Sequence, residues 1–129
     1  MRSDRLATGN FANRDGSHSR RIIIRIKVTK RNVTLTEGMR DWVERRLQFA
    51  VGRFSTQIRT VSVVFSDANG HRGGSDKHCR LRIMLNPSGE VVVEDTDPSV
   101  VEVVSSVAER AARSVNRELE RRREGRRGF

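Results

Sequence analysis

The segment from residue 67 to residue 80, DANGHRGGSDKHCR, contains two His, one Cys, two Asp and one Asn beside three Gly. Imidazole, thiolate and carboxylate groups are common metal ligands, and glycine-rich loops can surround a phosphate. The same glycines also suit the turn of a β-hairpin. These three interpretations differ in whether the protein is an enzyme, and the elements around the segment decide between them.

The strand expected after this segment separates its candidate ligands. Alternation along residues 77–86, KHCRLRIMLN, directs Cys79 to the core face and His78 to the opposite face. His71 lies in a Gly-flanked turn, and structural zinc needs four converging ligands. A phosphate-binding loop normally precedes a helix, whereas this one precedes a strand. We therefore expect no metal, no cofactor and no catalysis, with a small metal-dependent enzyme built on residues 67–80 as an alternative.

Hydrophobic periodicity predicts four strands. The run IIIRIKV alternates Ile and Val with Arg25 and Lys27, which is typical of a strand with one buried face. Similar alternation predicts the other strands, so the expected set is 22–28, 58–66, 77–86 and 90–95. Pro87-Ser88-Gly89 predicts a tight turn between the last two.

Two amphipathic helices complete the pattern. Thr36 is the expected N-cap of the first, whose apolar residues recur at helical spacing from Met39 to Phe54. Asp97 is the expected cap of the second, with Pro98 at its first position, and this helix is expected to end near residue 123.

The order β-α-β-β-β-α predicts an α+β domain with a four-stranded sheet and both helices on one face. The other sheet face then carries Arg25, Lys27, Arg80 and Arg82 and need not be buried. Residues 21–123 are expected to form this domain. Residues 1–20 read as a disordered arm and residues 124–129 as a basic flexible tail.

Basic residues are the strongest compositional signal. The chain has 26 Lys and Arg against 16 Asp and Glu, a formal net charge of +10, which indicates a polyanionic partner. Four arginines of the second helix share one face beside the apolar stripe: Arg110, Arg113, Arg117 and Arg121. Such a row predicts contact with a phosphate backbone. The alternative is a solvated face with ion pairs, because Glu109 and Arg113 stand at helical ion-pair spacing.

The element order also resembles that of double-stranded RNA-binding domains, which place two helices on a three-stranded antiparallel sheet. Those domains bind A-form shape and phosphates rather than base sequence. A row of exposed rings on which several bases could stack is not expected, because Trp42, Phe54 and Phe65 are assigned to the core. Phe49 falls outside the apolar stripe and is the one candidate for an exposed ring.

The run from about residue 21 to residue 123 resembles the bacterial family of ribosome hibernation-promoting factors and ribosome-associated inhibitors. The pieces that carry the resemblance are RNVTLTEGMRDWVERRL, VSVVFSDANGHRGGSDKHCRLRIML and EVVVEDTDPSVVEVVSSVAERAARSVNREL. The resemblance implies a non-enzymatic protein that binds RNA of the small ribosomal subunit and occupies its messenger and transfer RNA channel. It implies RNA contacts from Arg40, Arg46, Lys77, His78, Arg80, Arg110, Arg113, Arg117 and Arg121. Arg82, on the open sheet face, completes the expected set.

Two positions depart from the family pattern: Phe49 stands where some relatives carry Lys, and Val101 where relatives often carry Tyr. The long family form has a second domain that pairs ribosomes, and we expect this chain to be a short form. We also expect a cytoplasmic bacterial protein that is monomeric off the ribosome and has neither a membrane nor a small-molecule substrate as partner. A general duplex-RNA-binding module without ribosome preference is the alternative.

Overall fold

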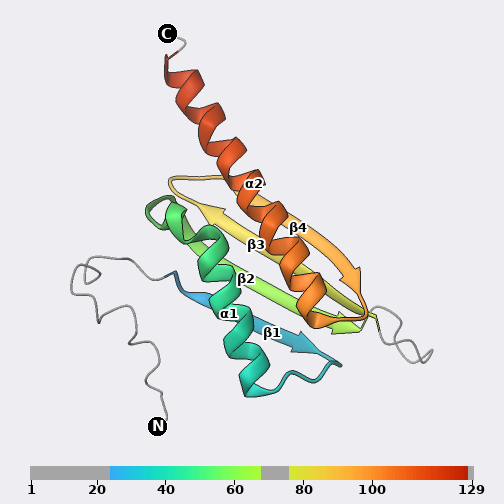
Figure 1. Ribbon diagram of the computed structural model, residues 1–129. Coiled ribbons are helices and arrows are strands. Elements are labelled where there is room, and N and C mark those ends of the chain that lie inside the picture. The colour runs from blue at the N-terminus through green and yellow to red at the C-terminus, as the bar shows by residue number, and fades with distance from the viewer. Residues whose placement is uncertain (1–23, 68–75, 128–129) are drawn as a thin grey trace.

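The computed structural model describes residues 24–67 and 76–127, which form a four-stranded sheet and two α-helices (Figure 1). In chain order the elements are β1 (Ile26–Arg31), α1 (Glu37–Val51), the 3₁₀ helix η3 (Gly52–Gln57), β2 (Ile58–Asp67), β3 (Lys77–Leu85), β4 (Glu90–Asp97) and α2 (Val100–Arg127). This order confirms the predicted β-α-β-β-β-α arrangement and the α+β class. No helix within the described ranges has an apolar stretch long enough to cross a bilayer.

The strands lie in the sheet in the order β1-β2-β3-β4, so β1 and β4 form its two edges. β2, β3 and β4 are antiparallel neighbours, and the predicted turn between β3 and β4 is closed by a 2.9 Å hydrogen bond from Leu85 N to Gly89 O. β1 runs parallel to β2, with Ile26 opposite Val61. A parallel pair needs a crossover connection, and α1 supplies it.

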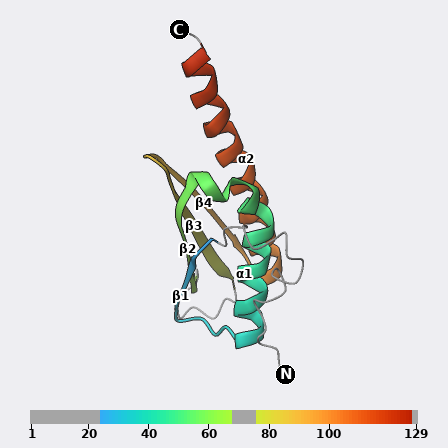
Figure 2. The same ribbon diagram turned by 90° about the vertical axis from the view of Figure 1, so that its left-hand side faces the viewer.

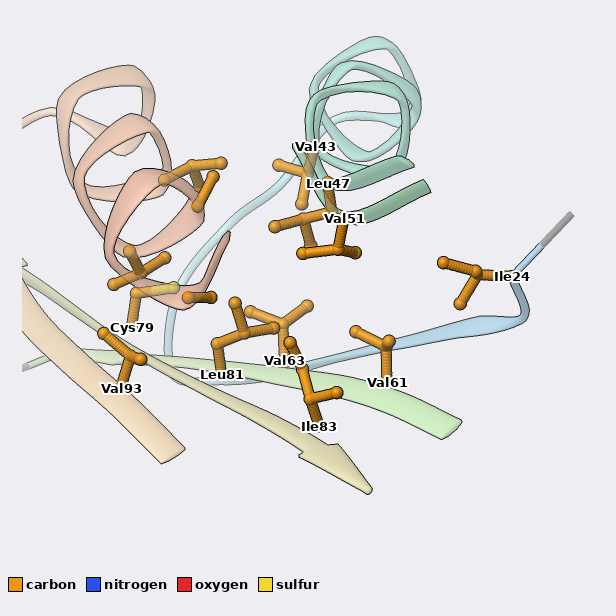
Figure 3. Close-up of a cluster of buried hydrophobic side chains, with 14 of the residues drawn as sticks. Ile24, Val43, Leu47, Val51, Val61, Val63, Cys79, Leu81, Ile83 and Val93 are labelled. Atoms are coloured by element: carbon orange, nitrogen blue, oxygen red, sulfur yellow. The ribbon is translucent and has the colours of Figure 1, made fainter. Parts of the chain in front are cut away.

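Both helices lie on the same face of the sheet, which Figure 2 shows nearly edge-on. The two central strands direct every second side chain beneath them, and these residues are at most 1% exposed: Val61, Val63, Phe65, Cys79, Leu81, Ile83 and Leu85. The helices close this layer with buried stripes from α1 (Val43, Leu47, Val51) and α2 (Val103, Val104, Val107, Ala108, Ala111, Val115) (Figure 3). The predicted inward orientation of Cys79 is confirmed.

The first helix begins as predicted and the second does not. Thr36 caps α1, where its hydroxyl oxygen accepts a hydrogen bond from Met39 N (3.1 Å). Asp97 is the last residue of β4 rather than a helix cap, and its carboxylate accepts from Ser99 N (2.9 Å). The hydroxyl of Ser99 in turn accepts from Glu102 N (3.2 Å), so α2 starts at Val100. Two capping residues, Asp97 and Ser99, stand two positions apart, and the predicted cap was the wrong one of the two.

β1 spans Ile26–Arg31, whereas the sequence predicts 22–28. Residues 22 and 23 lie outside the described ranges, as do the predicted arm at 1–20 and its boundary. Ile24 is buried in the core before the strand begins, and its backbone N–H and C=O bind the side-chain amide of Gln48 instead of a strand partner (3.3 and 2.5 Å). The strand continues through polar residues instead, since pairing with β2 requires only backbone groups.

The other end of each helix also differs from the prediction. α1 stops at Val51, and Phe54 enters the core from η3. α2 continues to Arg127, so residues 124–127 are helical where the sequence predicts a flexible tail. Arg122 links this helix to the β3–β4 turn: its guanidinium donates hydrogen bonds to the carbonyl oxygens of Asn86 (2.8 Å) and Ser88.

Gly89 lets the Arg122 guanidinium approach the backbone of this turn closely. Its φ is +112°, which glycine adopts readily, and a Cβ atom here would lie 2.7 Å from Nη2 of Arg122. The contact joins residues more than thirty positions apart. Helical periodicity carries no information about such contacts.

The buried thiol predicts a pH dependence of stability. Burial, with a smaller effect of the Asp95 charge, raises the pKa of Cys79 from 9.0 to about 12. Above pH 9 the unfolded chain therefore loses a proton that the folded chain keeps, and the free energy of unfolding falls by up to about 1.4 kcal/mol per pH unit. Denaturant titrations across this range should show a steeper fall for the wild type than for Cys79→Ala. Parallel pH profiles would contradict the assignment.

Candidate nucleic-acid interface

The arginine row predicted on α2 is present on the surface of that helix. Arg110, Arg113, Arg117 and Arg121 are all exposed, and they lie beside the buried stripe that faces the sheet. Residues four apart on a helix are about one turn apart along its axis, so the row follows the helix. The four side chains nevertheless have different surroundings, and these decide which of them can bind a partner.

Arg110 is used by the fold. Its Nη1 donates to the backbone carbonyl of Glu94 (3.0 Å) and lies 3.7 Å from the carboxylate of Asp95, both in β4. Hydrogen bonds from the Ser106 hydroxyl (2.6 Å) and Thr96 N (2.8 Å), with a smaller contribution from the charge of Arg110, hold the pKa of Asp95 below its usual value. The carboxylate therefore stays ionised at neutral pH, and Arg110 connects α2 to the edge strand.

Arg113 and Arg117 are not used in this way. Neither makes an ion pair or hydrogen bond with any other residue in the described ranges, whereas Arg121 pairs with Glu118 at 2.5 Å. Both side chains line an open hollow of about 550 Å³ between α2 and β4, here called the α2–β4 groove: Val92, Val93, Glu94, Arg110, Arg113, Ser114 and Arg117. An exposed guanidinium without a protein acceptor can bind a phosphate bidentately.

The predicted arginines of α1 are half-buried and also serve the fold. Nη2 of Arg40 donates to the backbone carbonyl of Val28 in β1 (3.1 Å). Nη2 of Arg46 lies 3.6 Å from the carboxylate of Glu109 in α2. The helical pair that the sequence suggests between Glu109 and Arg113 is therefore replaced by a pair between the two helices, which leaves Arg113 available.

Three of the four expected basic residues of β3, namely His78, Arg80 and Arg82, lie on the sheet face away from the helices, whereas Lys77 has the parity of the buried Cys79. Arg80 is exposed there, as the alternation predicts. Arg82 forms an ion pair with Glu90 of β4, and Nε2 of His78 lies 2.9 Å from the carboxylate of Glu94. These partners are surface groups, and exposed ion pairs contribute little stability.

Lys77 has acidic neighbours on both sides. It lies opposite Asp67 in β2 and opposite Asp97 in β4, so two carboxylates are close to its position in the sheet. Arg25 and Lys27 are exposed at the far edge of the open sheet face. The ten predicted residues therefore do not form one surface: α2 presents one group beside the α2–β4 groove, and β3 presents another on the opposite side of the sheet.

Sequence reasoning missed the wall of the groove that β4 provides. Val92, Val93 and Glu94 form this wall, and neither they nor Ser114 of α2 were among the expected site residues. The sequence signal that could have predicted this wall was the position of β4 as the last strand of an antiparallel series. Such a strand lies at the edge of the sheet, next to the helix that covers it.

The ligand-rich segment of residues 67–80 is divided by the fold. Cys79 is buried and His78 lies on the opposite face of β3, as predicted. His71 lies outside the described residues. Within residues 24–67 and 76–127, no three His, Cys, Asp or Glu side chains are grouped to hold a metal ion.

Comparisons with known proteins agree with this fold. The family model described as Sigma 54 modulation protein / S30EA ribosomal protein matches residues 26–123. The Thermus thermophilus Protein Y N-terminal domain superimposes with a TM-score of 0.60 at 26% identity, covering 74% of this chain and 98% of that one. A ribosomal subunit interface protein from Coxiella burnetii gives 0.62 at 13% identity, with 74% and 97% covered, a likeness in fold alone.

A search of curated proteins found no match. The family match, however, begins at the first residue of β1 and ends within the last turns of α2, so it includes every element of the fold. The chain therefore belongs to the Sigma 54 modulation protein / S30EA ribosomal protein family, the group of ribosome hibernation-promoting factors that its sequence resembles.

Proposed function

We propose that this protein binds the small ribosomal subunit and blocks its messenger and transfer RNA channel, held there by contacts between arginines and RNA phosphates. Membership of a ribosome-associated family supports the partner. The observation that carries the mechanism is the pair Arg113 and Arg117, exposed in the α2–β4 groove without an acceptor among the described residues. A formal net charge of +10 supports attraction to RNA at long range.

The geometry of the groove suits recognition by shape and charge. A rigid helix holds Arg113 and Arg117 one turn apart, so binding does not require a flexible loop to become ordered. Phosphate contacts fix register and orientation but carry no sequence information. Arg110 keeps the helix in place beside β4 and adds its charge to the same groove.

Inhibition by this mechanism is steric. A folded domain in the channel excludes other RNA from it, and no bond is made or broken. The protein acts in this proposal as a monomer in the bacterial cytoplasm, without cofactor or small-molecule substrate. Arg80, exposed on the opposite sheet face, can contact a second wall of the channel in this proposal.

Loss of the groove arginines should weaken ribosome binding. Changing Arg113 and Arg117 together to Gln removes two charge-assisted contacts of about 1.5 kcal/mol each, a loss on the order of a hundredfold in affinity. Co-sedimentation with small subunits over a concentration series measures it.

The matched control is the double variant Arg31→Gln, Arg59→Gln, which removes the same charge from exposed positions of β1 and β2. It should bind nearly as well as the wild type. Equal losses in both double variants would mean that total charge alone matters. Unchanged binding by the groove variant would place the site elsewhere.

Binding should also weaken steeply with salt, because each phosphate contact releases condensed counterions. The logarithm of the association constant should fall linearly with the logarithm of salt concentration, by about 0.7 to 0.9 for each contact. The groove variant should lower this slope by roughly 1.5. Salt-independent association would refute the mechanism, and equal competition by a plain RNA duplex would favour a general duplex-binding module over a ribosome-specific one.

A further inference from the structure

Phe49 is the most exposed large apolar side chain among the described residues, at 84% of its free surface. It lies on α1, outside the stripe that faces the sheet. Three and four positions before it, one turn away on the surface of α1, are Arg46 and Arg45. Three and four positions after it are Gly52 and Arg53, at the start of η3. The sequence around the ring thus supplies three arginines, of which Arg46 pairs with Glu109 of α2, and one residue without a side chain.

These neighbours distinguish Phe49 from an ordinary surface apolar residue. Single exposed apolar side chains are common and need no partner. A docking site for another protein, however, normally places further apolar groups around an exposed ring, and none of these four neighbours is apolar. At Gly52 an added Cβ would meet nothing within 4 Å, so open space lies one turn beyond the ring.

We propose that Phe49 stacks on one unpaired base of the bound RNA, while Arg45 and Arg53 contact the phosphates on either side of that nucleotide. Every base has a flat π-face, so an aromatic side chain binds it with little regard to sequence. A single ring accommodates a single base, which fits a chain whose other described aromatic rings are largely in the core. The proposal rests on the function above, since it assumes an RNA partner.

The arginine after the ring is already positioned. The guanidinium carbon of Arg53 lies 4.6 Å from the centre of the Phe54 ring, and Phe54 itself is anchored in the core. A cation over an aromatic ring gains stabilisation and loses some of its freedom to move. Arg53 therefore has less conformational entropy to lose when it binds a phosphate.

The ring also has a fixed relation to the α2–β4 groove. Both helices lie on one face of the sheet (Figure 2), and an ion pair between Arg46 and Glu109 joins them directly. RNA that follows the groove arginines of α2 and RNA that reaches Phe49 on α1 would meet the same side of the protein. The stacking contact thus extends the phosphate contacts onto the second helix.

The test compares Phe49→Leu, Phe49→Tyr and a control, Val101→Ala, in binding to two probes. Leu keeps an apolar side chain without a ring, Tyr keeps the ring, and Val101 is a distant, 43% exposed apolar residue. The probes are purified small ribosomal subunits and a single-stranded oligouridylate that carries one 2-aminopurine, whose fluorescence is quenched on stacking. Phe49→Leu should weaken binding to both by about tenfold, and it should lose the quenching.

The Tyr variant and the Val101→Ala control should behave like the wild type. Phe49→Leu binding to either probe as tightly as the wild type, or quenching equally, would overturn the stacking contact. Failure of the wild type to bind small subunits, together with ring-dependent quenching of the oligonucleotide, would overturn the proposed function and leave the stacking contact supported. Absence of quenching with the wild type would overturn the stacking contact, whether or not the protein binds small subunits.

Discussion

The burial of one sheet face beneath two helices is the constraint on which the rest of the structure depends. From Val61 onward the side chains of β2 alternate between the two sheet faces, as do those of β3. Burying Val63 and Leu81 beneath the helices therefore leaves their sequence neighbours on the open face. Each helix has one buried stripe, and its remaining faces are free for charge. The exposed arginines of α2 and the exposed ring of α1 therefore owe their positions to apolar residues that never contact a partner.

The same constraint separates total charge from available charge. Arg40, Arg110 and Arg122 each donate to a backbone carbonyl of the sheet or its turn, and Arg46 pairs across the helices. These guanidinium groups fix the helices against the sheet, and their hydrogen bonds and ion pairs make them less available to another partner. Arg113 and Arg117 have no such role among the described residues. A count of basic residues would treat all six alike, although their capacity to bind phosphate differs.

Local features of the fold were predictable, and features that depend on pairing were not. Thr36 caps α1 as its residue type and position suggest, and Cys79 points inward because strands alternate. The predicted beginning of α2 was wrong. Asp97 and Ser99 are both good capping residues, and only the end of β4 selects between them. The position of Lys77 between two aspartates depends on strand register. The partner of Glu109 depends on how the helices pack, which no spacing within one helix reveals.

The arginines that bind backbone carbonyls have a further consequence at the edges of the sheet. An edge strand offers unpaired backbone groups to any other extended chain, which is the usual beginning of aggregation. Arg40 donates a hydrogen bond to a backbone carbonyl of β1, and Arg110 donates one to a backbone carbonyl of β4. Each edge strand therefore has a guanidinium bound to its backbone. A second copy that approached either edge strand would meet this positive charge. The arginines that hold the helices against the sheet thus also disfavour strand-to-strand polymerisation of the protein.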